Sequence, residues 1–424
     1  MYLNGSNWNL RKRRRRSRPW RILLLVILIG AVSYFWRVYV PTVPPLFVPT
    51  PTATRSPASY ILEAESLFEA GKLYQAEAAY LEAIAIEPRE TAYYIDLARV
   101  RVFAGKYDEA EQAARDALVL NPDDALAHGV LGWALDFRAG QADDALEREA
   151  LLTEALTTVE RGLELNPNAP LIYAYYAEVL IDNNINAYED ALQAASRAVE
   201  LDSTLLEAHR ALGYVWEMTG NYELAVESYE IARQINPNLP RLYIDIGTMM
   251  RALGDVDAAV DNYLNAVALA PTSTEPLILV AEAYASVGEF GKASQFAQDA
   301  VDLDPTNARL HGNLGRMFYH NNVYDEAIVQ LQLAISGGVA EDGSTVEGIQ
   351  LDPGDSRVIE FYYTYGLALA RSNRCDEAIP VFEVLIRGVP DDEVAVYNAE
   401  EGLRLCAEEP LIPETETPTP TEES

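Results

Sequence analysis

The stretch GKYDEAEQAARDALVLNP at residues 105–122 is repeated almost unchanged further along the chain. Near-copies are GNYELAVESYEIARQINP at residues 220–237 and GEFGKASQFAQDAVDLDP at residues 288–305. In the copy at 220–237, apolar residues from Tyr222 to Ile235 recur at i, i+3, i+4 and i+7, which predicts an amphipathic helix. Each copy starts with glycine, which marks helix ends, and finishes with proline, which cannot continue a helix. The pattern therefore predicts a series of similar helical units.

One alanine position shows how long each unit is. The alanine that closes the motif G-x-Y-x-x-A, or a close variant of it, falls at six places: Ala76, Ala110, Ala225, Ala259, Ala293 and Ala327. Neighbours in this series are 34 residues apart, except across the interval from 110 to 225. A single helical pair cannot bury its own apolar face, so such units must stack. The spacing predicts an all-α array.

These features resemble the tetratricopeptide repeat, a helix–turn–helix unit of 34 residues. Position 8 of that unit is glycine or alanine, and the corresponding residues here are Ala64, Ala98, Gly132, Ala177, Gly213, Gly247, Ala281, Gly315 and Gly366. The resemblance implies a right-handed α-solenoid of about nine units over residues 58–408. In that array, residues 392–408 are a C-terminal capping helix.

Two stretches depart from the regular spacing. In the third unit, additional helix-forming residues at about 138–154 are expected to lengthen the inter-helix turn or the second helix. Before the ninth unit, the glycine-rich residues 336–355 predict a loop, with a short strand within residues 344–351. Long loops in compact arrays are often functional, but a tolerated surface insertion fits the same residues.

The N-terminal segment has the pattern of a membrane anchor. Residues 1–21 are basic and residues 22–40 are mostly apolar, which predicts one transmembrane helix. Eight basic residues precede the apolar segment, so the positive-inside rule predicts a cytoplasmic N-terminus and an extracytoplasmic body. The alternative is a cleaved signal peptide, although GAVSYFWR at residues 30–37 lacks a convincing small-x-small cleavage site.

Proline-rich segments flank the predicted array. Residues 41–57 are rich in proline and threonine, which predicts a semi-rigid linker between the membrane and the repeats. Residues 409–424 have a similar composition with added acid, which predicts a disordered tail. For both segments the alternative is an unconstrained end with no role, and for the tail this alternative fits equally well.

Charge excludes one class of partner. The formal net charge is −33, and residues 1–55 hold ten of the 32 basic residues and no acid. The rest of the chain therefore has 22 basic and 65 acidic residues, a net charge of −43. Because so acidic a body repels nucleic acid, we expect no nucleic-acid partner.

Nothing in the sequence predicts catalysis. The chain contains no HxxxH pair, no phosphate-binding GK[ST] loop and no GxSxG motif. His128, His209 and His311 fall at position 4 of the repeat, which is a packing position, and His320 ends a first helix. We expect no enzymatic activity, no catalytic residue, no cofactor and no metal site.

The two cysteines are candidates for a disulfide. In the array that the resemblance implies, Cys375 immediately precedes the second helix of the ninth unit and Cys406 lies near the end of the capping helix. These helices run antiparallel, so the start of one lies beside the end of the other. A disulfide would agree with an oxidising, extracytoplasmic location. Two buried free cysteines are the alternative.

The resemblance also implies a binding groove. In tetratricopeptide repeats the first helices line a concave surface that takes an extended peptide or a partner's helix. Mapping its positions onto this chain gives Trp133, Arg210, Tyr214, Arg241, Arg251, Arg309, Arg316, Tyr319 and Tyr363. Arginine pairs bidentately with carboxylates, so we expect an acidic or C-terminal segment as the ligand. The alternative is that these arginines only balance neighbouring acids.

The sequence thus predicts a membrane-tethered scaffold for protein–protein interaction. Its layout resembles anchored tetratricopeptide proteins of the bacterial cell envelope, with the repeats outside the cytoplasmic membrane. A glycan- or small-ligand-binding envelope protein is the alternative, using some of the 25 tyrosines as stacking surfaces. A third possibility is a catalytic site within residues 336–355.

Overall fold

The computed structural model describes residues 19–39, 55–142 and 144–407. It divides into two compact units between residues 55 and 56. Most of the predicted linker and all but the last residues of the predicted basic N-terminus (1–21) lie outside the described residues. The predicted tail at 409–424 lies outside them as well.

The first unit contains one apolar helix. α1 (Pro19–Tyr34) continues into a π-helical turn at Phe35–Tyr39. The segment Pro19–Val38 has a mean hydropathy of 1.9 over 20 residues, so it is long and apolar enough to cross a membrane. A signal sequence has the same length and composition as an anchor, so these properties fit both.

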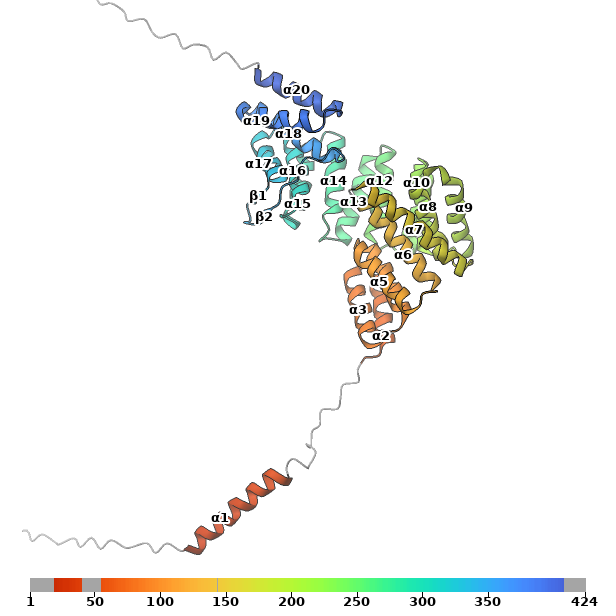
Figure 1. Ribbon diagram of the computed structural model, residues 1–424, viewed down its shortest axis with the longest axis vertical. Helices are drawn as coiled ribbons and strands as arrows, with labels where there is room; N and C mark the ends of the chain where they lie inside the picture. Colours follow the sequence, from red (N-terminus) through yellow and green to blue (C-terminus); the bar gives the residue numbers. More distant parts are fainter. Residues whose placement is uncertain (1–18, 40–54, 143, 408–424) are drawn as a thin grey trace, which may run out of the picture. The chain divides into compact units, whose positions relative to one another are not determined.

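The second unit is an array of nine helical pairs and a final helix (Figure 1). The first helices of the pairs are α2 (Pro57–Glu69), α4 (Thr91–Phe103), α6 (Ala125–Gln141), α8 (Pro170–Asn183), α10 (Leu206–Met218), α12 (Pro240–Ala252), α14 (Glu275–Ser286), α16 (Ala308–His320) and α18 (Ser356–Arg371). The second helices are α3 (Leu73–Ile86), α5 (Tyr107–Leu120), α7 (Ala145–Leu165), α9 (Tyr188–Leu201), α11 (Tyr222–Ile235), α13 (Val256–Leu269), α15 (Phe290–Leu303), α17 (Tyr324–Ser336) and α19 (Cys375–Gly388). α20 (Glu393–Ala407) follows as the predicted capping helix.

The turn inside most pairs uses a residue in the left-handed region. Gly105 has a φ of 73°, and the amide of the next residue, Lys106, donates to the Arg101 carbonyl at 2.9 Å. This bond satisfies a carbonyl that the helix end would otherwise leave free. In the eighth and ninth units Asn322 and Asn373 take the glycine's place, with φ of 61° and 57°. Asparagine tolerates this conformation better than other non-glycine residues, so the turn is preserved.

Position 4 of the repeat joins six of the first helices to the turn before them. The hydroxyls of Tyr94, Tyr173 and Tyr243 donate to the backbone carbonyl six residues earlier at 3.2, 3.3 and 3.0 Å. The Nε2 atoms of His128, His209 and His311 lie 3.0, 2.9 and 3.0 Å from the equivalent carbonyl. These histidines therefore make the same contact with the preceding turn as the tyrosines do.

Close contact between the paired helices depends on small residues at position 8. A Cβ on Gly247 in α12 would lie 2.6 Å from the Tyr263 ring in α13. We expect Gly247→Ala to lower the free energy of unfolding by about 1–3 kcal/mol, because the buried ring must move. Gly140→Ala in α6 is the matched control, since a Cβ there meets nothing within 4 Å. Urea denaturation followed by circular dichroism measures both, and equal losses would contradict the packing argument.

The third unit corrects one expectation. The additional residues at about 138–154 were expected to lengthen the turn or the second helix, but they lengthen the first helix as well. α6 has 17 residues and α7 has 21, so both helices are longer than their counterparts. Asp144 caps α7 by accepting from the amides of Leu146 and Glu147, which starts the second helix directly after the first.

The glycine-rich insertion folds against the array. β1 (Gly338–Val339) and β2 (Thr345–Val346) form a two-stranded antiparallel hairpin. β2 lies within residues 344–351, where the sequence predicts a strand, and β1 was not predicted. The Ile349 amide then donates to the Ala334 carbonyl at 2.8 Å, and the Tyr362 hydroxyl donates to the Ile349 carbonyl at 3.1 Å. The insertion is thereby held on α17 and α18.

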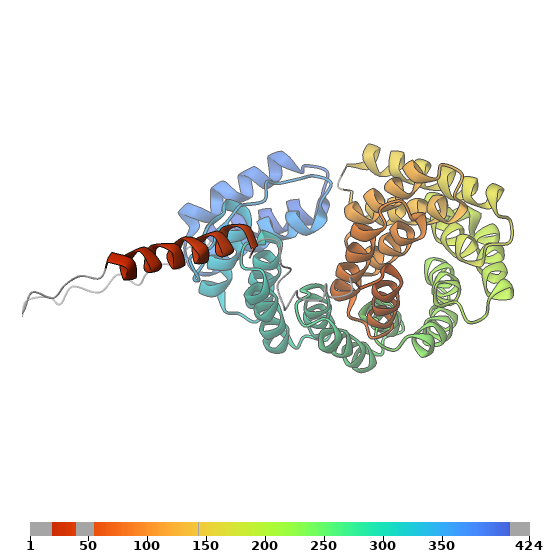
Figure 2. The same ribbon diagram turned by 90° about the horizontal axis from the view of Figure 1, so that it is seen from below.

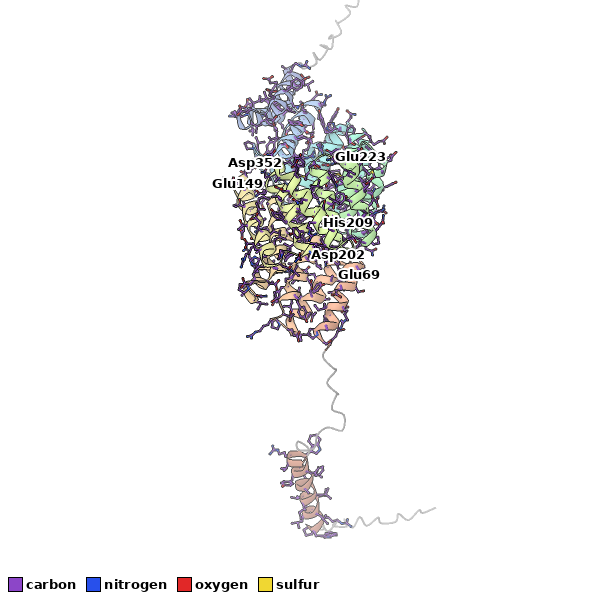
Figure 3. All side chains as sticks on the ribbon, turned by 90° about the vertical axis from the view of Figure 1, so that its right-hand side faces the viewer. Glu69, Glu149, Asp202, His209, Glu223 and Asp352 are labelled. Atoms are coloured by element: carbon purple, nitrogen blue, oxygen red, sulfur yellow. A yellow bond between two sulfur atoms is a disulfide. The ribbon has the colours of Figure 1, made fainter. Side chains whose placement is uncertain are left out.

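The N-terminal repeat meets the fifth and sixth units across the curve of the array. Asn236 and Asn238, between α11 and α12, donate from their side-chain amides to the carbonyls of Phe68 and Glu69 at 3.3 and 2.8 Å. Figure 3 labels Glu69 at the end of α2, where these contacts lie. The two segments approach so closely that a Cβ on Gly71 would lie 2.0 Å from the Asn238 carbonyl oxygen.

Further contacts bind the same segments together. The Arg99 guanidinium in α4 donates from Nε to the buried Glu207 carboxylate in α10. Leu206, Leu239 and Leu242 belong to the same buried apolar cluster as the N-terminal helices. Figure 2 shows the orange N-terminal helices within the curve that the yellow and green helices trace. We call residues 57–276 the closed turn and residues 277–407 the C-terminal arm.

Candidate functional site: the concave surface

The closed turn contains two predicted groove residues that are buried. Trp133 in α6 is 1% exposed, and its Nε1 donates to Glu178 at 2.7 Å while its ring stacks on Tyr175. Arg210 in α10 is 2% exposed and donates from Nη1 to both Glu178 oxygens at 2.6 Å. The prediction that these two side chains line an open groove needs correction. The N-terminal helices close over this part of the concave surface, so both side chains belong to the interior.

Two other predicted residues lie at the wall of this interior. The Tyr214 hydroxyl donates to both oxygens of Asp182 at 2.7 and 2.9 Å. The Arg241 Nε donates to Asp245 at 2.7 Å, and Asp245 is 4% exposed. The structure thus brings both residues into the polar network around Arg210.

Two adjoining cavities of ≈270 Å³ each lie inside the closed turn. They share four lining residues: Tyr107, Phe137, Arg210 and Arg241. One extends between the turn after α2 and the start of α14, and the other extends toward Gln141 at the end of α6. We call the cavity that reaches Gln141 the axial pocket.

Burial perturbs the carboxyl groups of the closed turn. The pKa of Asp136 is raised well above its usual value by burial, and then by the charges of Asp182 and Glu178. Burial raises the pKa of Asp182 to about 6 and that of Glu217 to about 7. Burial also raises the pKa of Glu178, although Arg210 offsets part of this effect. More carboxyl groups than cations are therefore buried here.

The C-terminal arm presents a different surface, with arginines that are partly exposed. Its arginine cluster consists of Arg309, Arg316 and Arg357, and Arg251 of the closed turn shares Glu282 with it. Arg251 pairs with Glu282 at 3.3 Å, Arg309 with Asp355 at 2.7 Å, and Arg357 with Glu282 at 3.0 Å. Arg316 makes only a 3.4 Å contact with Glu360 and a 3.8 Å contact with Glu282.

Arg316 is the least satisfied member of the arginine cluster. Its Nε and Nη2 atoms are buried and have no hydrogen-bond partner among the described residues. Burial lowers the pKa of Arg316, and the positive charge of Arg357 adds to the effect. An anionic group beside Arg316 would therefore be stabilised by the free donors.

Both predicted tyrosines of the C-terminal arm lie near this cluster. Tyr363 lines a pocket of ≈360 Å³ together with Arg357, Glu360 and residues at the start of α20. Burial raises the pKa of Tyr363 to about 12, so the ring is neutral at physiological pH. Tyr319 accepts a hydrogen bond from Arg371 at 3.3 Å.

Some residues of the concave surface are missing from the sequence prediction. Asp136 falls at a groove position, four residues after Gly132, so the repeat pattern contained a signal for it. Arg357 lies before the place where the repeat pattern begins a first helix, because α18 starts early. No repeat position marks it.

Cys375 and Cys406 form a disulfide that joins α19 to α20, with Cα atoms 5.5 Å apart. Among the described residues, no group of three histidine, cysteine or acidic side chains is arranged to hold a metal ion.

We expect Cys375→Ser and Cys406→Ser to loosen the end of the array. Losing the cross-link should cost about 2–4 kcal/mol of local stability. Hydrogen exchange of the α20 amides measures this loss, with α12 as the internal control because it lies far from the disulfide in sequence. Unchanged exchange in α20 of both variants would contradict a structural role.

The paired helices and their concave surface define a helical-repeat protein. A family model described as tetratricopeptide repeat matches residues 95–153, 186–240 and 281–338. Over these residues the chain is similar to the tetratricopeptide-repeat family, a class of scaffolds that generally mediate protein–protein interaction and are typically non-catalytic.

Solved structures show the same fold at low sequence identity. The human IFIT1 dimer with PPP-AAAA matches with a TM-score of 0.55 and 16% identity, over 82% of each chain. The APC/C hetero-tetramer Cut9–Hcn1 matches with a TM-score of 0.53 and 14% identity, over 81% of this chain and 55% of that one. A search of curated proteins found no match. These identities support the fold alone.

Proposed function

We propose that the chain is a membrane-tethered scaffold that binds an acidic or C-terminal segment of a partner protein at the arginine cluster of the C-terminal arm. The observation that carries the proposal is Arg316, whose Nε and Nη2 donors are buried and unused. In the closed turn, by contrast, the Trp133 indole and the Arg210 Nη1 atom donate to Glu178, and both side chains are buried. Partner binding in the groove is therefore confined to the C-terminal arm.

The alternative is that the arginines only neutralise Glu282 and Glu360. These two carboxylates contact the cluster at 2.9–3.8 Å, so part of its charge is already balanced. A carboxylate ligand would supply the unpaired donors of Arg316 with hydrogen-bond acceptors that these two acids do not provide. Binding measurements on variants distinguish the two cases.

We expect Arg309→Gln combined with Arg316→Gln to weaken binding of short acidic peptides by at least about tenfold, because charge-assisted hydrogen bonds are lost. Fluorescence anisotropy with peptides that end in a free carboxylate measures the affinity. The matched control is Arg161→Gln combined with Arg197→Gln, because these arginines lie on second helices and are about half exposed. An equal loss in the control, or no peptide binding by the native chain, would contradict the proposal.

The tether in this proposal is α1, with its N-terminus in the bacterial cytoplasm and the repeats outside. The length and apolar character of Pro19–Val38 support a span, and the positive charge before it supports this orientation. The disulfide supports an oxidising compartment for the repeats.

Thiol labelling in intact cells tests the location. A membrane-impermeant reagent should label Cys375 and Cys406 only after an impermeant reductant is added. Labelling that requires broken membranes would place the repeats inside and overturn this topology. Recovery of the N-terminal peptide from the membrane fraction separates a retained anchor from a cleaved signal sequence.

A further inference from the structure

Beyond partner binding, the axial pocket contains a pair of carboxyl groups without a cation. Asp136 is 5% exposed, and its Oδ1 atom is buried with no hydrogen-bond partner among the described residues. The neighbouring Asp182 accepts from the Tyr214 hydroxyl and shares a side-chain hydrogen bond with Asp136. Neither carboxyl group forms an ion pair with a described residue, although both line the same pocket.

The two arginines that line the pocket already bond other carboxylates. Arg210 bonds both oxygens of Glu178, and Arg241 bonds Asp245 at 2.7 Å. The positive charge that Asp136 and Asp182 lack must therefore be a shared proton or a bound cation. Buried like charges this close cannot both remain ionised without one of the two.

The rest of the pocket suits the organic part of a cation. The Tyr107 and Phe137 rings stack with centroids 4.9 Å apart, and both line the pocket beside the carboxyl pair. Aromatic faces attract ammonium groups and also cover alkyl chains. The pocket reaches Gly140 and the exposed Gln141 at the end of α6, which gives a route from solvent.

We propose that the axial pocket binds a small organic cation, with a primary ammonium group between Asp136 and Asp182 and its alkyl chain against Tyr107 and Phe137. Binding replaces the shared proton of the carboxyl pair. The raised pKa values of Asp136 and Asp182 agree with a site that holds this proton when empty. Glu178, Arg210, Tyr214 and Arg241 are the other titratable groups that line the pocket.

Isothermal titration calorimetry of the full chain with butylammonium and 1,4-diaminobutane tests the proposal. We expect saturable binding at pH 7.5, with no binding of 1-butanol or butyrate, which have the same chain but lack the positive charge. Between pH 5.5 and 7 binding should release protons, seen as a different heat in buffers of different ionisation enthalpy. No saturation by either amine, or equal binding of 1-butanol, would overturn the proposal.

Variants of the two carboxyl residues test whether the amine binds between them. Asp136→Asn and Asp182→Asn keep the shape of the pocket and should weaken amine binding by at least about tenfold, because a charge-assisted hydrogen bond is lost. Asp123→Asn, at a largely exposed position, is the matched control and should bind as the native chain does. Equal affinity in all three variants would overturn the site. A titration with a lysine-containing peptide then separates the two sources of the ammonium group: binding of the peptide indicates a partner's lysine, and binding of the free amines alone indicates a small molecule.

Discussion

Arg210→Ala should lower the free energy of unfolding by about 3–5 kcal/mol at pH 7.5, because it leaves a buried carboxylate without its cation. Glu178 is 2% exposed and accepts two hydrogen bonds from Arg210, so only the Trp133 indole remains as its partner. The loss should be smaller at pH 5, because Glu178 then becomes protonated more easily. Urea denaturation followed by circular dichroism at the two pH values measures both effects.

Arg197→Ala is the control for Arg210→Ala. Arg197 pairs with Glu200 at 3.1 Å on α9, where the two side chains are 44% and 66% exposed. Exposed pairs of this kind contribute about 0–1 kcal/mol. Similar losses for the two variants would show that Arg210 does not hold a buried charge, and would contradict the account of the closed turn.

The second large effect concerns pH. Burial raises the pKa of Asp96 and Asp182 to about 6 and that of Glu217 to about 7, above their usual values of 3.8, 3.8 and 4.5. At pH values between the usual pKa and the raised pKa of a group, the folded state binds a proton that the unfolded state does not. Stability should therefore rise as pH falls from 7.5 to about 5, by about 1.4 kcal/mol for each aspartate and about 2.5 kcal/mol for Glu217. This added stability is lost again as the pH rises through the pKa values of the folded state.

Glu217→Gln isolates one contribution to this pH dependence. Glutamine can still accept the hydrogen bond that the Tyr229 hydroxyl donates to Glu217 at 2.6 Å, but it needs no proton. We expect the variant to be more stable than the native chain at pH 7.5 and equal to it near pH 4.5. Glu200→Gln, at an exposed position, should leave the pH profile unchanged. A profile of Glu217→Gln parallel to that of the native chain would refute the assignment.

The helical pairs could be predicted from the sequence because each unit repeats local signals. Gly105 takes the left-handed conformation that a helix–helix turn requires, and small residues such as Gly247 sit where a partner's ring approaches. The unit length follows from the spacing of the alanines, and the number of pairs follows from the nine small residues at position 8. These are short-range properties of each unit, so one sequence displays them directly.

The closed turn could not be predicted because it depends on how the small rotations between units add up. Nothing near Trp133 in the sequence indicates that Asn236 and Asn238 bring the first repeat across the groove. The repeat pattern therefore assigned Trp133 and Arg210 to an open surface. The position in the repeat determines that Trp133 and Arg210 lie on the concave face. Contacts between residues distant in sequence then bury this face in the interior.

A cross-linking measurement tests the closed turn most directly. Lys72 and Thr272 are exposed and line the same cavity, although they are far apart in the chain. A Lys72→Cys and Thr272→Cys double variant, treated with a short bifunctional thiol reagent, should form an intramolecular cross-link rapidly and almost completely, while each single variant should form none. Cross-linking no faster than in urea would show that the first repeat does not close over the groove, and would contradict the account.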